Sequence, residues 1–421
     1  MRVMQLAHGI YPFRNAGVEV YTYELGKQLM ARGHEVVAVV PANGTGREHA
    51  EMEVFSLPVP ERDYFSCDVN VRDCERISEV FEKFVRHWRP DIIHVQHLIH
   101  MGWRALPRLA ELNVPFLISL PDYWFLCQRV QRMCGGSWTL CAAKCKGVSP
   151  LHRPLAFVKT IAYDCYRRRS ILSYLNGSPA PLISISARTA EIYEESGVDK
   201  SRVAVQSWGI PLEKYIAPVR DKASGQATAF GFIGALLPIK GAEVLIEAFK
   251  KAELNATLDI YGSGNRAYED KLKSLCAGQP IRFHGAYNHT ELPELLADVD
   301  VLVVPSLWEE AYGLVVQEAL ALKKIVIASA TGGLANQIEH GINGFLVKVN
   351  DVDSLVGQMR YVNEHRHGIA ARLDFNKNLR DIADDAERFE QWYAWTIKNW
   401  KALCAKAVSV SDFGRIDKVC A

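Results

Sequence analysis

Short apolar runs rich in β-branched residues recur along the chain, and most are followed by a loop and a helix-like segment. The first run, Arg2–Ala7, precedes a helical pattern over about Glu19–Arg32 and then another apolar run. This order is typical of a βαβ unit, which requires a parallel sheet and a right-handed crossover. A second series of such runs begins at Phe230–Ile233 and ends at Phe345–Val347. The sequence therefore predicts two successive α/β domains.

A polar segment, residues 214–227, separates the two series and has the composition of a linker. A chain of 421 residues is long enough for two or three domains, each with its own core. We expect Rossmann-like domains over residues 1–215 and 228–383 and a final helix over residues 384–403. Two doubly wound domains joined in this way form a cleft to which the carboxyl ends of both sheets can contribute.

The balance of charge gives no sign of a nucleic-acid partner, since 49 basic and 48 acidic residues leave a formal net charge of +1. No apolar run approaches the roughly 18 to 20 residues that a membrane span needs. Met1–Ile10 is too short and too mixed for a signal peptide. We therefore expect a cytoplasmic protein.

Four of the ten cysteines are crowded into one segment: Cys127, Cys134, Cys141 and Cys145. Their spacings are wider than those of the usual zinc pattern. A cytosolic chain keeps its thiols reduced. Structural thiols, a reducible loop, a metal site and a disulfide all remain open for this segment.

Two carboxylates frame a stretch that has the pattern of strand, loop and helix. Val301–Val304 predicts a buried strand, and a helix is expected to begin near Gly313. The backbone amides from Tyr312 to Leu314 and the positive end of the helix suit a phosphate. Glu318, one turn further, can accept hydrogen bonds from the vicinal hydroxyls of a ribose, and Glu310 would face whatever a diphosphate carries. The alternative is a solvated carboxylate pair on an ordinary amphipathic helix.

Other loops of the second series carry glycine or charge after a strand. They are Gly234–Gly241 with Lys240, Gly262–Gly264, and Thr331–Gly333. Lysine is a mobile point charge suited to a diphosphate, and glycine lets a ligand approach the backbone. In the first series, Gly17 opens a helix in the same manner, although a plain turn glycine is the alternative.

Polar residues also follow the apolar runs of the first series, where parallel sheets bind ligands. His94, His97 and His100 accompany one run, and Asp122 follows the run Pro115–Leu120. Each histidine is a candidate functional group or a structural histidine with satisfied hydrogen bonds.

The segment Leu151–Leu175 is prone to form a helix and carries five basic residues: Arg153, Lys159, Arg167, Arg168 and Arg169. Such a segment is either a helix at a membrane surface or a solvated helix face.

In combination, these motifs resemble those of the retaining GT-B glycosyltransferases with a Glu-x7-Glu signature (glycosyltransferase family 4, group 1). Glu310–Glu318 fits that signature, Gly17–Glu19 resembles a first-loop Gly-Gly-x-Glu pattern, and Phe232–Phe249 resembles a Gly-x5-Lys-Gly segment. Gly332–Gly333 and Gly341–Gly344 resemble late glycine motifs. The resemblance covers roughly residues 1–400.

The resemblance implies an α/β GT-B fold, with two Rossmann-like domains facing across a cleft and the final helix packing back on the first domain. It implies an N-terminal acceptor domain and a C-terminal nucleotide-sugar domain. The reaction would move a hexose-type sugar from a UDP- or GDP-sugar to a saccharide or lipid-linked saccharide, by front-face attack with retention. No metal or bound cofactor would be needed. Asp122-Tyr123-Trp124 followed by cysteines resembles enzymes of surface polysaccharide and glycolipid assembly, which implies peripheral contact with the inner face of the membrane.

Carried over residue by residue, the resemblance gives Glu318 the ribose hydroxyls and Glu310 the donor sugar. Lys240 and the amides of Gly313 and Leu314 would bind the diphosphate. The other candidates for nucleotide-sugar binding are Gly17, Gly262, Gly264 and Tyr312, and the other candidates for catalysis are His97 and Asp122.

The sequence departs from the family pattern at three positions. Ala16, Ala235 and Pro121 stand where the family often has glycine, arginine and histidine. Without that histidine, His97 or His100 could substitute. Pro121 and Ala235 motivate an alternative function, a catalytically weakened nucleotide-sugar-binding partner subunit, whereas retention of both Glu310 and Glu318 favours the transferase. A nicotinamide oxidoreductase, suggested by Gly262–Gly264, is disfavoured because a full Gly-x-Gly-x-x-Gly motif is missing.

Overall fold

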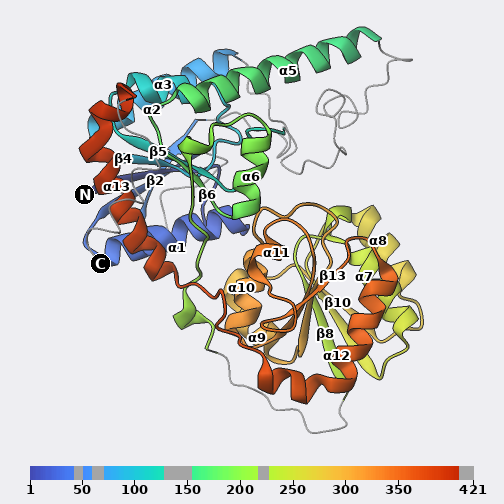
Figure 1. The fold of residues 1–421 in the computed structure, drawn as a ribbon. Coiled ribbons are helices and arrows are strands. Elements are labelled where there is room, and N and C mark those ends of the chain that lie inside the picture. Colours follow the sequence, from blue (N-terminus) through green and yellow to red (C-terminus); the bar gives the residue numbers. More distant parts are fainter. Residues whose placement is uncertain (42–50, 59–70, 128–153, 217–226, 407–421) are drawn as a thin grey trace. The chain divides into compact units, whose positions relative to one another are not determined.

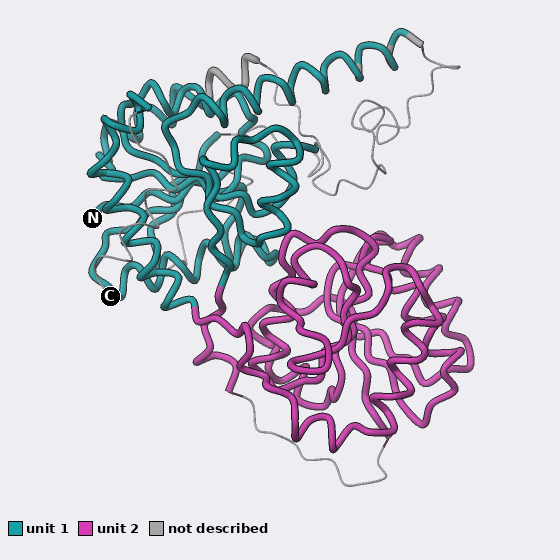
Figure 2. The backbone as a smooth tube through the Cα atoms, viewed as in Figure 1, with its two compact units in different colours: residues 1–208, 382–421 teal, residues 209–381 magenta. Residues whose placement is uncertain are grey.

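The computed structural model describes residues 1–41, 51–58, 71–127, 154–216 and 227–406. The chain forms two compact units, shown in teal and magenta in Figure 2. Unit 1 contains Met1–Trp208 together with the chain from Ile382 onward, and unit 2 contains Gly209–Asp381. The polypeptide therefore passes between the units twice, after Trp208 and after Asp381.

Unit 1 is built on a parallel seven-stranded sheet in the order β3-β2-β1-β4-β5-β6-β7. Its strands are β1 (Arg2–Leu6), β2 (Glu35–Pro41), β3 (Glu53–Leu57), β4 (Ile92–Val95), β5 (Phe116–Leu120), β6 (Leu182–Ser184) and β7 (Val203–Val205). Its helices are α1 (Gly17–Ala31), α2 (Val71–Trp88), α3 (Ala105–Glu111), α5 (Pro154–Gly177), α6 (Ala187–Glu195) and α13 (Ile382–Cys404).

Unit 2 is built on a parallel six-stranded sheet in the order β10-β9-β8-β11-β12-β13. Its strands are β8 (Thr228–Ile233), β9 (Ala256–Tyr261), β10 (Ile281–Gly285), β11 (Val301–Val304), β12 (Ile325–Ser329) and β13 (Phe345–Val347). Its helices are α7 (Ala242–Ala252), α8 (Arg266–Leu275), α9 (Leu292–Ala297), α10 (Leu314–Ala321), α11 (Leu334–Gln337) and α12 (Val352–Arg372). The prediction of two parallel α/β sheets is confirmed.

Each sheet reverses its strand order next to its first strand. In unit 1 the reversal falls between β1 and β4, and in unit 2 between β8 and β11. Loops leaving the carboxyl ends of these strands diverge, and the crevice between them is where open α/β sheets bind ligands. The strands themselves are buried on both sides, which explains their continuous apolar sequences.

Helix α13 belongs to unit 1 although it lies at the end of the described chain, and it runs alongside α1 (Figure 1). Tyr21 on α1 donates a hydrogen bond of 2.8 Å to Asp385. His34 and Arg32, at the end of α1, contact Glu390. The predicted return of the final helix to the first domain is confirmed, and the spaced aromatic residues of that helix belong to the core.

Two elements have no clear signal in the sequence. In strand β3 only Leu57 of the five residues is buried, and the apolar pattern is short. Helix α12 has a weak pattern as well. Its buried residues recur with helical spacing, but charged and glycine positions interrupt them.

One buried hydrogen-bonded histidine joins α13 to the sheet of unit 1. His94, fully buried on β4, contacts the hydroxyl of Tyr393 through Nδ1 and that of Ser119 through Nε2, both at 2.8 Å. Burial lowers its pKa from 6.5 to about 3. The structural alternative for His94 is therefore the correct one.

We predict that replacing His94 with Gln flattens the acid limb of the stability curve. Between pH 6.5 and about 3 the unfolded chain binds a proton at His94 that the folded chain does not bind. Acidification therefore lowers the free energy of unfolding of the wild type by about 1.4 kcal/mol per pH unit from this residue alone. Urea denaturation at several pH values measures the slope. The control is His365→Gln, which changes an exposed histidine. Equal slopes of the free energy of unfolding against pH for wild type and His94→Gln would contradict the prediction.

Candidate functional site

The loop after β8 and the loop after β11 are fastened to each other in unit 2. The amide of Leu307 donates to the carbonyl of Ile239 at 2.7 Å. Gly241 has a φ of +76°, and a Cβ atom there would overlap the carbonyl oxygen of Pro305. Only glycine suits this conformation and this close approach. This close packing of the two loops places Lys240, just before Gly241, beside the residues that follow β11.

Lys240 and Glu310 form an ion pair at this junction. The Lys240 Nζ atom lies 2.5 Å from Oε1 of Glu310, and the hydroxyl of Ser306 donates to the same oxygen at 2.8 Å. The side chain of Glu310 is 7% exposed and that of Lys240 is 29% exposed. Lys240 also lies 5.5 Å from the centre of the Trp308 ring. A partly exposed cation is thus held beside a buried carboxylate.

A third loop, after β12, fixes the backbone at Glu310. The amide of Gly333 donates to the carbonyl of Glu310 at 2.6 Å. A Cβ atom at Gly332 would overlap that same carbonyl oxygen. The Thr331–Gly333 turn therefore acts by close backbone packing, which positions the Glu310 loop.

The start of α10 has no side-chain cap. Its N-cap is Gly313, with a φ of +90°, and the first helical residue is Leu314. The carbonyl of Tyr312 accepts a hydrogen bond of 2.5 Å from Gln337, which orients the turn into the helix. An uncapped helix start with the positive end of the helix dipole is suited to an anion.

Glu318 lies on the first turns of α10 and is 4% exposed. Its Oε1 atom is 2.6 Å from Nε2 of His289 and accepts a hydrogen bond of 3.3 Å from the hydroxyl of Tyr215. Burial, with a further contribution from the Glu318 carboxylate, raises the pKa of Tyr287. Because Glu310 and Glu318 are both buried and bonded, the alternative of a solvated carboxylate pair is excluded.

The amides of Gly262 and Gly264 have partners inside the protein. Gly262 donates to the carbonyl of Gly285 and Gly264 donates to the carboxylate of Glu269, both at 2.7 Å. In this conformation these glycines let the loop after β9 pack against the loop after β8. A direct contact of either glycine with a nucleotide sugar stays a prediction.

In unit 1, His97 and Asp122 are brought together at the carboxyl ends of β4 and β5. The amide of Ile99 donates to Nδ1 of His97 at 3.0 Å, so the neutral ring carries its proton on Nε2. Nε2 lies 3.0 Å from Oδ2 of Asp122. Burial lowers the pKa of His97, although the Asp122 charge opposes this effect. Both ring nitrogens are therefore engaged, and the arrangement suits His97 to orienting Asp122.

A second acid–histidine pair lies beside the first. His8, after β1, is 3.1 Å from Glu19 in the first turn of α1, and its ring centre is 4.4 Å from that of His97. Burial alone would raise the pKa of Glu19, but the charge and hydrogen bond of His8 lower it to about 2. Gly17, at the exposed start of α1, is two residues from Glu19.

Sequence reasoning did not single out several of these groups. His289 and Tyr215 carried no motif signal, because their partner Glu318 is 29 and 103 positions away along the chain. Ser306 lies four positions from Glu310 and His8 lies in the loop after β1, but neither residue belongs to a recognisable motif. His100 is buried, and burial reinforced by Arg14 lowers its pKa to about 4. Among the described residues no cluster of metal-ligating side chains occurs. Cys127 is buried, whereas Cys134, Cys141 and Cys145 lie outside the described residues.

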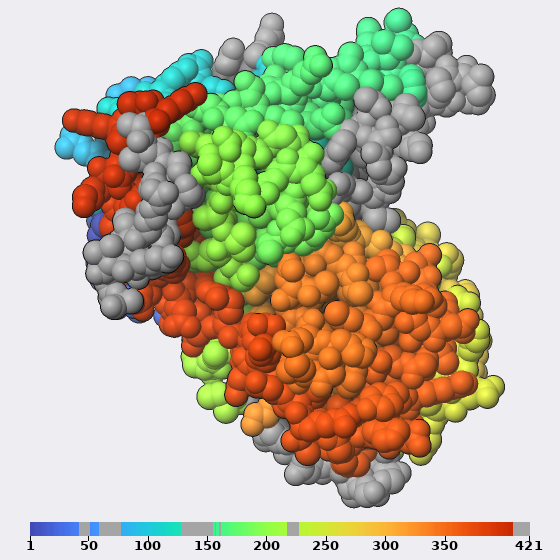
Figure 3. Space-filling model, in the orientation of Figure 1, coloured from blue at the N-terminus to red at the C-terminus, as the bar shows by residue number. Residues whose placement is uncertain are grey.

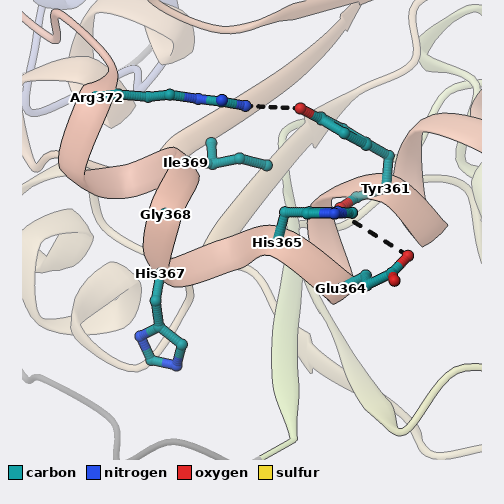
Figure 4. Close-up of a pocket in the computed structure, with 7 residues that line it drawn as sticks. All are labelled: Tyr361, Glu364, His365, His367, Gly368, Ile369 and Arg372. Atoms are coloured by element: carbon teal, nitrogen blue, oxygen red, sulfur yellow. Dashed lines mark hydrogen bonds and ion pairs between the residues drawn. The ribbon is translucent and has the colours of Figure 1, made fainter.

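A separate pocket of about 310 Å³ lies along α12 (Figure 4). Its lining comes from this one helix: Tyr361, Glu364, His365, His367, Gly368, Ile369 and Arg372. Arg372 donates to the hydroxyl of Tyr361 at 2.6 Å. No loop from the carboxyl end of a strand contributes to it, so we assign it no part in the site.

Two doubly wound parallel sheets in one chain, with a C-terminal helix returning to the first unit, define the GT-B class of fold. Two family models match the sequence. The glycosyl transferase 4-like domain matches residues 16–209, and glycosyl transferases group 1 matches residues 220–381. The chain belongs to the group 1 family of glycosyltransferases and uses a nucleotide-sugar donor.

Known proteins match over most of the chain. The sulfoquinovosyl transferase SQD2 of Arabidopsis thaliana is 34% identical over 395 residues, which are 87% of this chain and 69% of that protein. A 42.6 kDa protein in the cps region of Klebsiella pneumoniae is 23% identical over 365 residues, covering 82% of this chain and 90% of that protein. The crystal structure of Anabaena HepE with UDP and glucose aligns with a TM-score of 0.65 at 18% identity, over 93% of this chain and 99% of that chain. This last likeness concerns the fold alone.

We predict that the ring of His97 is neutral, as the Nε2–H tautomer, at pH 6.5 and above, because burial lowers its pKa from that ordinary value. Its Nδ1 atom accepts the Ile99 amide, and a charged ring could not accept that bond. Long-range proton–nitrogen NMR spectra recorded across a pH series report both the tautomer and the titration, and His97→Gln identifies the signal. Titration above pH 6.5, or an Nδ1–H tautomer, would contradict the geometry.

Within the part of the chain that the structure describes, we find no helix with the length and apolar character needed to span a bilayer.

Proposed function

We propose that unit 2 binds a nucleotide diphosphate sugar at the carboxyl ends of β8 and β11, and that the chain transfers the sugar with retention. The observation that carries this proposal is the way both carboxylates are held. The hydrogen bonds of Glu310 and Glu318 to described residues fall on Oε1 in each case. Bonds to Oε1 fix each carboxylate, and we assign to Oε2 the hydrogen bonds from hydroxyl groups of the donor, since an ionised carboxylate accepts at both oxygens.

In this proposal Glu318 accepts from the ribose hydroxyls and Glu310 accepts from the transferred sugar. Lys240 and the amides of Gly313 and Leu314 bind the diphosphate, and Tyr312 forms the turn beside them. The support is geometric, since Lys240 is fastened 2.5 Å from Glu310 and the start of α10 carries no side-chain cap. Gly262 and Gly264 complete the nucleotide side by shaping the loop after β9.

The charge arrangement favours the transition state over the ground state. As the glycosidic bond stretches, negative charge grows on the leaving diphosphate. A lysine and helix amides that are already oriented stabilise that charge without reorganising. No protein metal ligand is required in this scheme, because Lys240 supplies the positive charge.

Unit 1 would supply the acceptor side of the reaction. Asp122, oriented by His97, is the proposed contact to the acceptor hydroxyl or the sugar. Gly17 is proposed to present its amide to the diphosphate.

We propose a hexose-type sugar from a UDP- or GDP-sugar, passed to a saccharide or lipid-linked saccharide in surface polysaccharide or glycolipid assembly at the cytoplasmic side of a membrane. The names of the relatives support this range: a protein of a cps region, a sulfoquinovosyl transferase, and a structure holding UDP and glucose.

A nucleotide-sugar-binding partner subunit is the second candidate. Two positions favour it: Pro121 precedes Asp122, and the exposed Ala235 leaves the loop after β8 with Lys240 as its single cation. A partner subunit would bind the donor but would not transfer its sugar, so one experiment separates the transferase from the partner subunit.

The test incubates the full chain with a panel of UDP- and GDP-hexoses, with and without saccharide and lipid-linked saccharide acceptors. Release of nucleoside diphosphate that depends on the acceptor, with the donor's anomeric configuration kept in the product by NMR, supports the transferase. Tight donor binding with no release from any pair supports the partner subunit. Inversion would overturn the retaining mechanism.

Replacing Glu318 with Ala should weaken donor binding by about 1 to 3 kcal/mol, the usual cost of losing a charged hydrogen-bond partner. His289→Ala should weaken donor binding less than Glu318→Ala does. It removes a hydrogen bond that positions the Glu318 carboxylate but leaves the carboxylate itself in place. Calorimetry measures both affinities, and Glu364→Ala on the exposed side of α12 is the matched control. Wild-type donor affinity in a folded Glu318→Ala protein would contradict the assignment of Glu318 to the ribose hydroxyls.

A further inference from the structure

Two buried glutamines form a hydrogen-bonded pair next to the start of α10. Gln317 on α10 is 0% exposed and Gln337, the last residue of α11, is 2% exposed. The Nε2 atom of Gln317 donates to Oε1 of Gln337 at 2.9 Å. The part of the chain that contains them, orange in Figure 3, forms much of the visible face of unit 2. A buried amide costs free energy unless it is hydrogen-bonded, so packing alone would favour an apolar side chain at either position.

Gln337 is bonded to the carbonyls of the turn that leads into α10. Its Nε2 atom donates to the carbonyl of Tyr312 at 2.5 Å and to that of Gly313 at 3.4 Å. In a planar trans peptide group the N–H points away from the C=O. The carbonyl of Tyr312 therefore fixes the direction of the Gly313 amide, and the carbonyl of Gly313 fixes that of the Leu314 amide. These are the two amides to which the proposed function assigns the diphosphate.

The glycine in this turn needs an anchor from elsewhere in the chain. Gly313 has φ +90° and ψ 72°, and it has no side chain with which to cap α10. Glycine adopts positive and negative φ about equally readily, so the residue itself does not hold the neighbouring peptide groups in one orientation. The amide of Val316 donates to the carbonyl of Gly313 at 3.0 Å, which fixes the helix side of the turn. Gln337 supplies an anchor for the peptide group between Tyr312 and Gly313.

Gln317 connects Gln337 to the segment 373–381, which joins α12 to α13. Its Nε2 atom also donates to the carbonyl of Asn378 at 3.1 Å, and its Oε1 atom accepts from the amide of Arg380 at 3.0 Å. Nδ2 of Asn378 in turn donates to the backbone carbonyl of Gln337 at 3.1 Å. Both N–H groups and the oxygen of the Gln317 side chain are therefore used. A buried polar network that is satisfied in this way holds its members in one arrangement.

We propose that Gln337, supported by Gln317, is a positioning residue of the donor site. It aims the amides of Gly313 and Leu314 at the diphosphate, and it links the order of the segment 376–380 to diphosphate binding. This inference rests on the diphosphate site proposed above for the start of α10. Both glutamines act through the backbone. Because the turn and the segment share one network, a ligand that stabilises the turn also stabilises the hydrogen bonds of the segment, and the linkage is reciprocal.

The first experiment measures binding to Gln337→Met, which keeps the length of the side chain but removes its amide donors. Ligand-observed NMR titrations compare UDP and GDP with uridine and guanosine. The affinity for the diphosphates should fall about tenfold or more, because the two amides are no longer held in place. The affinity for the nucleosides should be unchanged, since Glu318 holds the ribose. Gln317→Met should cause a smaller loss of the same kind, because it removes the support of Gln337 and leaves its donors. Gln358→Met, the same replacement on α12, should bind all four ligands as wild type does.

The second experiment follows hydrogen exchange at the amide of Arg380, which bonds to Gln317 and not to the ligand in this scheme. Saturating UDP or GDP should slow this exchange about threefold or more in the wild type, because the shared network becomes more stable. In Gln337→Met the bound diphosphate should leave the exchange rate unchanged. A role limited to overall stability would instead change the rate equally with and without the ligand.

Each result decides the inference. Wild-type affinity for the diphosphates in a folded Gln337→Met protein, or equal losses for diphosphates and nucleosides, overturns the positioning role. Exchange at Arg380 that does not respond to a bound diphosphate in the wild type overturns the linkage and leaves the donor site intact. A wild type that binds no nucleoside diphosphate overturns the donor site itself. If Gln337→Met does not fold, Gln317→Met is judged by the same criteria.

Discussion

The ion pair between Lys240 and Glu310 connects the two loops on either side of the strand-order reversal in unit 2. Lys240 comes from the loop after β8 and Glu310 from the loop after β11, and the two strands pair directly in the sheet. The contact depends on glycine at position 241, where a Cβ atom would overlap the carbonyl oxygen of Pro305, the residue that follows β11. The order of the strands, the conformation of the two loops and the charges at the site therefore depend on one another. The function proposed for the chain rests on this dependence.

Unit 1 has a different set of groups at the corresponding point, where the strand order of its sheet reverses. His8 follows β1 and His97 follows β4, and these are the strands between which that sheet reverses. The two imidazoles lie with their centres 4.4 Å apart, each bonded to its own carboxylate. Burial makes these carboxylate–histidine pairs rigid, since an unpaired charge there would be strongly disfavoured. In the proposed function, unit 2 therefore presents a cation and a helix start for a diphosphate, whereas unit 1 presents an oriented acid.

Much of this could be predicted from sequence, because parallel strands have continuous apolar runs and Glu310–Glu318 combines strand, loop and helix signals in a short stretch. The partners of those carboxylates could not be predicted. Ser306 lies four positions before Glu310 in the same loop, and no motif marks its hydroxyl as a partner of that carboxylate. His289 contacts Glu318 only after folding joins the ends of different strands, and no spacing rule links position 289 to position 318. The roles of Gly262 and Gly264 were equally hidden, since a glycine that serves backbone packing and a glycine that serves a phosphate have the same sequence. In α5, apolar residues on two opposite faces cancelled the periodic signal that distinguishes an inner face from an outer one.

In the proposed function, Lys240 and the start of α10 hold a diphosphate while Glu318 holds the ribose. Calorimetric titration of Lys240→Ala with a nucleoside diphosphate and with the corresponding free nucleoside separates these two roles. The affinity for the diphosphate should fall about tenfold or more, because a charge-assisted contact is lost, and the affinity for the nucleoside should be unchanged. Equal effects on both ligands, or wild-type affinity for the diphosphate in the folded variant, would contradict the claim.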